Sequence, residues 1–90
     1  MAYVYLLRCG DGSLYCGWTV DLDARVAAHA AGRGGRYTRS RLPVTLAAAW
    51  RTPDRGSARR LEAQIKRRNR PEKDRLLAGE ALPEGAVRLS

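Results

Sequence analysis

The sequence predicts an α+β fold in which a small three-stranded antiparallel sheet is flanked by about three helices. Three observations predict it: two strand-like segments joined by a tight-turn sequence, a capped amphipathic helix after them, and two further capped helices behind a third strand-like segment. The predicted order is strand, strand, helix, strand, helix, helix. A chain of 90 residues suits one such domain and excludes a two-domain enzyme.

The first two predicted strands cover residues 3–9 and 14–20, YVYLLRC and LYCGWTV, which are rich in aromatic and branched side chains. The sequence between them contains Asp11-Gly12, a pair that readily adopts the positive φ angles of a tight turn. These features together predict a β-hairpin.

The length of the hairpin turn decides whether Tyr5 and Tyr15 share one face of the sheet. A two-residue turn would point the two side chains to opposite faces, because successive residues of a strand alternate. A bulge at Gly10 or Gly17, or a loop with an odd number of residues, would bring both tyrosines to one face.

The middle of the chain predicts a helix, a basic segment and a strand. Asp21 is a suitable N-cap for a helix over residues 22–31, which Gly32 closes. Residues 32–43 contain three glycines, four arginines and no acidic residue, which favours a mobile basic loop or a short irregular helix. Residues 44–50, VTLAAAW, predict the third strand, which the Thr-Pro pair at 52–53 stops.

Two more helices follow the third strand. Either Asp54 or Ser57 can cap a helix over SARRLEAQIKRR. Asn69 and Glu72, three residues apart with a proline between them, resemble a capping box for a short helix that ends at Gly79. The predicted domain therefore spans residues 1–79, and residues 80–90 form a C-terminal tail to which no function is assigned.

The charge of the chain points to a polyanionic partner. Lys and Arg number 17 against 9 acidic residues, and the segment 33–75 holds 14 of these basic residues and 4 acidic ones. Such an asymmetry favours nucleic acid, although a solvated surface on an arginine-rich chain would show the same bias. The candidate nucleic-acid contacts are Arg33, Arg36, Arg39, Arg41, Lys66 and Arg67.

The hydropathy of the chain and its few cysteines indicate where the protein is located and whether it binds zinc. No apolar run approaches the ~18 residues of a membrane span, and the N-terminal residues lack the pattern of a signal peptide, so a cytoplasmic protein is predicted. Cys9 and Cys16, with a single histidine, form no recognisable zinc spacing. Both cysteines are therefore expected to be reduced and packed against the sheet.

The first helix carries two chemically informative residues on its apolar side. Arg25, Val26 and His29 all lie within about 60° of the first residue of this helix. His29 is either a hydrogen-bonded core histidine or a catalytic one. Arg25, if it faces the interior, needs an anion beside it.

The second predicted helix carries an isolated carboxylate. Glu62 is the only acidic residue between Asp54 and Glu72, a stretch with six arginines and one lysine. It is either a charge partner for Arg59 or Lys66, or a ligand for a divalent metal that also binds phosphate.

Five segments in order carry a resemblance to a known family: YVYLLRC, DGSLYCGWT, DLDARVAAH, GGRYTR and LEAQIKR. Together they resemble the GIY-YIG nuclease superfamily, and within it the small stand-alone bacterial proteins, over roughly residues 2–78. The first motif here is Tyr3-Val4-Tyr5, without the family's glycine, and the second is Tyr15-Cys16-Gly17.

The resemblance implies a role for each matching position. The implied catalytic residues are Tyr5, Tyr15, Arg25 and His29, the implied metal ligand is Glu62, the motif glycine is Gly17, and Asn69 is a candidate for supporting the site.

The activity implied is that of a metal-dependent endonuclease that hydrolyses phosphodiester bonds. Glu62 would hold Mg²⁺ or Mn²⁺, Arg25 would offset transition-state charge, and Tyr5 would help to deprotonate water. Acting as a phenolate at neutral pH requires the pKa of Tyr5 to fall by about three units, through Arg25, the metal and His29. Tyr15 would orient the water or the phosphate.

The implied substrate is DNA rather than RNA, selected by its structure rather than its sequence, in repair or recombination. The alternative is a non-catalytic DNA- or RNA-binding module, or a subunit of a larger nuclease complex. A chain without a second DNA-reading domain would take its specificity from nucleic-acid shape or from a protein partner.

Overall fold

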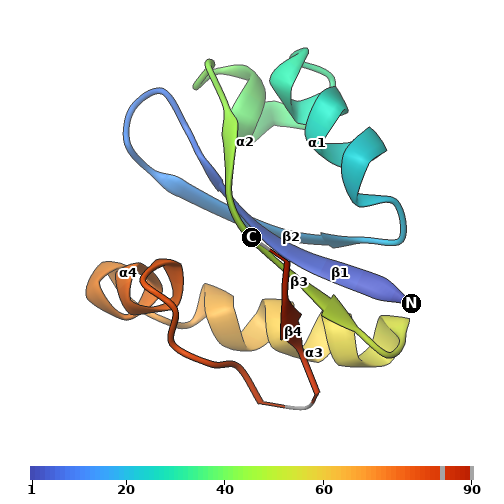
Figure 1. Ribbon diagram of the computed structural model, residues 1–90. Coiled ribbons are helices and arrows are strands. Elements are labelled where there is room, and N and C mark those ends of the chain that lie inside the picture. Colours follow the sequence, from blue (N-terminus) through green and yellow to red (C-terminus); the bar gives the residue numbers. More distant parts are fainter. Residues whose placement is uncertain (84, 90) are drawn as a thin grey trace.

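An antiparallel sheet with strands in the order β2-β1-β3-β4 separates two helical layers (Figure 1). The computed structural model describes residues 1–83 and 85–89. The strands are β1 (Ala2–Arg8), β2 (Leu14–Thr19), β3 (Thr45–Thr52) and β4 (Val87–Arg88). Helices α1 (Leu22–Ala30) and α2 (Arg36–Arg39) lie on one side, and α3 (Arg55–Lys66) and α4 (Arg70–Leu77) on the other. The predicted α+β class and antiparallel sheet are confirmed.

The sheet has one strand more than the sequence predicted. Residues 87 and 88 of the predicted tail pair with Arg51 and Trp50 and extend the sheet beyond β3. A two-residue strand is too short to carry an alternating pattern, so no pattern in residues 80–90 predicted it. Strand β3 also continues two residues further than predicted, because Thr52 still pairs with Ala2 and donates its hydroxyl hydrogen bond to the Ala2 carbonyl at 2.9 Å.

The layer that contains α3 and α4 covers the larger part of the core. Alternate residues of β1 point into this layer. They pack against side chains of α3 that lie about one helical turn apart, such as Leu61 and Ile65. Asp54 rather than Ser57 caps α3, since its carboxylate accepts a hydrogen bond from the Ser57 amide at 2.7 Å. The largest fully buried members of this cluster are Val4, Leu6, Trp50, Leu61, Ile65 and Leu76.

The hairpin loop between β1 and β2 has an odd number of residues. Cys9 and Ser13 close it through a 2.9 Å hydrogen bond, so three residues lie between them, and Gly12 among these has a φ of 84°. Tyr5 is therefore paired with Gly17, and Leu7 with Tyr15. The two tyrosines share the face toward α1, so the simple two-residue turn is wrong and the odd-loop alternative is confirmed.

None of the helices in residues 1–83 and 85–89 combines the length and the apolar character that crossing a bilayer requires.

The capping box predicted for the last helix is present and carries a stability prediction. Asn69 accepts a hydrogen bond from the Glu72 amide at 3.0 Å, and the Glu72 carboxylate accepts one from the Asn69 amide at 2.9 Å. We expect Asn69→Ala to lower the free energy of unfolding by about 1 kcal/mol, because one amide of α4 loses its partner. Urea denaturation measures this, with Asn69→Asp as the control that keeps the cap. An alanine variant as stable as the wild type would contradict it.

Candidate active site

A buried chain of three polar side chains lies between the sheet and α1. The Tyr5 hydroxyl is 3.2 Å from His29 Nε2, and His29 Nδ1 is 2.7 Å from the Thr38 hydroxyl on α2. None of the three side chains is more than 1% exposed. His29 therefore has a hydrogen-bond partner on each ring nitrogen, which favours a fixed ring orientation.

Two glycines make room for this chain. A Cβ atom at Gly17 on β2 would overlap the Tyr5 hydroxyl, and one at Gly34 would overlap the His29 ring. The backbone at both positions thus lies directly against the Tyr5 and His29 side chains. The family motif predicted Gly17, whereas Gly34 and Thr38 were not predicted as site residues, although both lie in the family-like segment GGRYTR.

Tyr15 lies beside the same histidine. Its ring centroid is 5.2 Å from that of His29 and 5.6 Å from that of Tyr37. The Arg41 guanidinium covers the Tyr37 ring at 3.8 Å, and it also pairs with Asp11 of the hairpin loop at 3.0 Å. The aromatic cluster therefore continues from the site to the hairpin loop.

The helix pattern predicted that Arg25 faces the core, but the residue is exposed and lies beside Thr19 and Val20 at the end of β2. Its guanidinium acts on Tyr5 through a hydrogen bond and through its positive charge, both of which lower the pKa of that phenol. Burial and the neighbouring Tyr15 outweigh this effect and raise the pKa of Tyr5 to about 12. The expected fall in the Tyr5 pKa is thus not found for the chain's own residues.

The pKa of His29 is shifted downward, opposite to that of Tyr5. Burial, and then the charge of Arg25, lower the pKa of His29 below its ordinary value of 6.5. A neutral phenol therefore faces a neutral imidazole at pH 7.

This pairing predicts a measurable titration. The chain has one histidine, so its Cε1 proton can be followed by NMR as pH falls. We expect the midpoint to lie below 6.5, and Arg25→Gln to move it upward because one cause of the shift is removed. As pH falls, His29 takes up its proton at a higher pH in the unfolded chain than in the folded one. The folded state is therefore destabilised relative to the unfolded state as pH falls below 6.5. A midpoint at or above 6.5 would contradict the burial of the ring.

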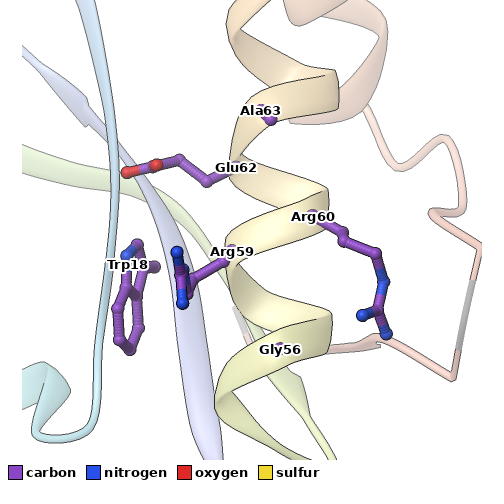
Figure 2. A pocket seen from close by; sticks show the side chains of 6 residues that line it. All are labelled: Trp18, Gly56, Arg59, Arg60, Glu62 and Ala63. Carbon is purple, nitrogen blue, oxygen red and sulfur yellow. The ribbon is translucent and has the colours of Figure 1, made fainter.

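Glu62 approaches the edge strand β2 from the opposite face of the sheet. Its carboxylate is one-fifth exposed and lies 3.6 Å from the Lys66 ammonium, one of the two charge partners predicted for it. It borders a hollow of about 480 Å³ that Trp18 and Arg59 also line. Figure 2 shows Glu62 and Arg59 directed toward the strand that carries Trp18, whereas Arg60 points away from it.

A second hollow, of about 280 Å³, contains Arg25 and Arg55 and shares Trp18 with the first. Strand β2 is the edge of the sheet, and its residues pack into both layers, Cys16 and Trp18 on one side and Tyr15 on the other. Gly17 faces the Tyr5 hydroxyl, and the next residue, Trp18, faces the hollow with Glu62. The structure thus brings the predicted site residues to the two sides of one strand.

The remaining predicted residues divide into two groups. Arg41 and Lys66 are engaged in the ion pairs described above, and Asn69 is engaged in its capping box. The other candidate contacts for nucleic acid are exposed: Arg33, Arg36, Arg39 and Arg67.

Comparison with known proteins places the chain in a family. Residues 1–75 match the family model of the GIY-YIG catalytic domain. The chain belongs to the GIY-YIG family. This GIY-YIG domain covers most of its length, as the sequence motifs had indicated.

Its relatives in the family are small proteins of similar length. The UPF0213 protein BH0048 of Halalkalibacterium halodurans is 43% identical over 89 residues, which cover 98% of this chain and 95% of the relative. A UPF0213 protein of Streptococcus sanguinis is 50% identical over 72 residues, covering 80% of this chain and 83% of the relative. The solution NMR structure of BH0048 superposes with a TM-score of 0.59 over 92% of this chain and 89% of that one.

The donor atoms of this GIY-YIG site suit a hard divalent cation. Among the residues that the structure describes, no three His, Cys, Asp or Glu side chains gather around one point, and Glu62 is the one acidic residue that lines its hollow. Mg²⁺ commonly takes one or two protein carboxylates and completes its shell with water and phosphate oxygens. Burial, and then the charge of Glu62, raise the pKa of the neighbouring Cys16 thiol to about 12, and Mg²⁺ prefers oxygen ligands to sulfur.

Proposed function

We propose that this GIY-YIG protein is a metal-dependent endonuclease that hydrolyses phosphodiester bonds in DNA. The observation that carries the proposal is the placement of a buried Tyr5–His29 pair and the Glu62 carboxylate on the two sides of one edge strand. Proton transfer and phosphate binding are the two tasks that such hydrolysis requires. The exposed arginines would contact the DNA backbone, which favours selection by structure over selection by sequence.

Proton removal from the attacking water would pass through Tyr5 to His29. The Tyr5 oxygen accepts the water proton as its own proton moves to His29 Nε2. The water O–H bond breaks, the oxygen forms a bond to phosphorus, and the P–O bond to the leaving group breaks as the leaving oxygen takes up a proton from solvent. Such a relay needs no phenolate in the resting site, which agrees with a Tyr5 pKa raised to about 12 and a neutral imidazole.

Thr38 and Tyr15 would position the base in this relay. The Thr38 hydroxyl holds the Nδ1 side of His29, so that Nε2 faces Tyr5. The Tyr15 ring packs beside the imidazole and restricts its movement. Both therefore act on the reaction through His29.

Glu62 would hold Mg²⁺ or Mn²⁺ at the hollow on the other side of β2. The bound ion would polarise a phosphate oxygen and draw charge from it. Lys66, whose ammonium lies 3.6 Å from the Glu62 carboxylate, would have to give up this ion pair for Glu62 to hold the ion.

Arg25 would stabilise the negative charge that develops on the phosphate. Its guanidinium is exposed in the hollow next to Tyr5 and can form two parallel hydrogen bonds to phosphate oxygens. We expect Arg25→Ala to lower the single-turnover cleavage rate by about 100-fold. The assay is nicking of branched and single-stranded DNA with Mg²⁺ or Mn²⁺. The control is Arg75→Ala, which removes an equal charge from α4, where Arg75 pairs with Glu80 at 3.6 Å, and which lies outside the predicted nucleic-acid contacts.

The same assay decides between an enzyme and a binding module. Cleavage that EDTA abolishes and that Arg25→Ala impairs supports the nuclease. Equal residual cleavage by the wild type and both variants would mean a contaminating nuclease and would overturn the proposal. Binding without cleavage under any metal would favour the non-catalytic module.

A further inference from the structure

Trp18 is an aromatic side chain that the proposed mechanism does not use. It lies on the edge strand β2, is only partly buried, and borders both hollows at once. The other tryptophan, Trp50, lies on the inner strand β3 with 1% exposure. Trp18 thus presents part of its indole where a ligand can reach it, between the hollow with Glu62 and the hollow with Arg25. Figure 2 shows the first of these hollows, with Trp18 facing Arg59 and Glu62.

Two arginine side chains near Trp18 can bind a ligand. Arg55 lines one hollow with it and Arg59 lines the other. Within residues 1–83 and 85–89, neither arginine makes a side-chain hydrogen bond or an ion pair. This contrasts with Arg68 and Arg70, which pair with carboxylates at 2.6 and 2.9 Å. Unengaged guanidinium groups on both sides of an accessible indole match a ligand with an aromatic ring and flanking negative charges.

A nucleotide with an unpaired base has this chemistry. Proteins that hold single strands stack bases on aromatic rings and track the backbone with basic residues. A base inside a duplex has both faces covered by its neighbours and cannot stack on a protein ring without leaving the helix. The position of Trp18 between Glu62 and Arg25 places such a base beside the phosphate that would be cleaved.

We propose that Trp18 stacks an unpaired nucleobase next to the scissile phosphate, with Arg55 and Arg59 holding the flanking phosphates. This inference rests on the proposed nuclease function and adds a residue that selects the substrate. The protein would therefore prefer DNA with an unpaired base over a continuous duplex.

Binding in EDTA tests the inference apart from cleavage. The probe is a labelled single-stranded oligonucleotide of about 12 nucleotides, followed by fluorescence anisotropy. We expect Trp18→Leu to weaken binding by about 5- to 150-fold, the range for one stacked base, and Trp18→Phe to retain most of the affinity. An abasic strand of equal length should bind the wild type and Trp18→Leu alike.

Intrinsic fluorescence supplies a second measurement. The oligonucleotide should quench the wild-type emission and leave that of Trp18→Phe unchanged, because the remaining Trp50 is buried. This comparison needs only a conservative variant and stands even if Trp18→Leu does not fold.

Equal affinities of the wild type for the base-containing and abasic strands would overturn the inference, as would the same quenching in Trp18→Phe. Tight binding of a continuous duplex that depends on Trp18 would also overturn it. Wild-type cleavage with Mg²⁺ is scored separately. If the protein cleaves DNA but binds the base-containing and abasic strands equally, only the proposed role of Trp18 is overturned. If binding depends on the base but no cleavage is seen, only the proposed nuclease function is overturned. Failure to bind any oligonucleotide overturns both.

Discussion

Glu62→Gln is expected to lower the cleavage rate by about 1,000-fold or more while nucleic-acid binding persists, because the hollow loses its one carboxylate ligand for the metal. Glutamine keeps the size of the side chain and its packing beside Trp18. The lost ion pair with Lys66 is partly exposed and contributes little to folding. Single-turnover cleavage at saturating protein, with Mg²⁺ or Mn²⁺, measures the effect.

The matched control for this variant is Asp74→Asn. It removes one negative charge from α4, where Asp74 pairs with Arg70 at 2.9 Å, and it leaves the hollow unchanged. Its cleavage rate should stay within about twofold of the wild type, as for most surface substitutions. Cleavage by Glu62→Gln at more than a tenth of the wild-type rate would show that the metal is not held there.

Gly17→Ala is expected to lower cleavage by about 100- to 10,000-fold, the range for loss of general acid–base catalysis. The added methyl group would occupy the position of the Tyr5 hydroxyl. Tyr5 is buried and packed, so it must move as a whole and its hydrogen bond to His29 is broken. Loss of the relay follows although no catalytic side chain has been replaced.

The His29 proton signal separates this effect from general unfolding. Gly17→Ala should shift the His29 resonance and its titration while circular dichroism retains the α+β spectrum. Gly56→Ala on α3 is the control, because a Cβ there meets its neighbours at an ordinary 3.4 Å. It should leave the His29 signal unchanged. Full activity in Gly17→Ala would mean that Tyr5 is not the residue that accepts the water proton.

Elements with local signals were predicted well from the sequence. The hairpin strands, the cap at Asp21 and the capping box at Asn69 depend on residues a few positions apart, and all three are confirmed. The parity of the hairpin loop was not predicted, because Asp11-Gly12 suits a two-residue turn as well as the three-residue loop that forms. The loop length follows from closure at Cys9 and Ser13, which tertiary packing selects.

The site shows the same division between local and distant signals. The family motifs pointed to Tyr5, His29 and Glu62, and each lies at the β2 edge or the layer beside it. Thr38 lies in the family-like segment GGRYTR, but no local pattern assigned it to the site, since it meets His29 only after the basic segment folds back over α1. The direction of the Tyr5 pKa shift also depends on burial, which no local pattern reports.

The three-residue hairpin loop constrains how this protein can change over evolution. Inserting or deleting one residue between Cys9 and Ser13 would turn every later side chain of β2 to the other face of the sheet. Tyr15 would then leave His29, and Trp18 would leave Glu62, in a single event. Loop lengths among functional descendants should therefore differ by even numbers, or an odd change should come with a compensating bulge in β2.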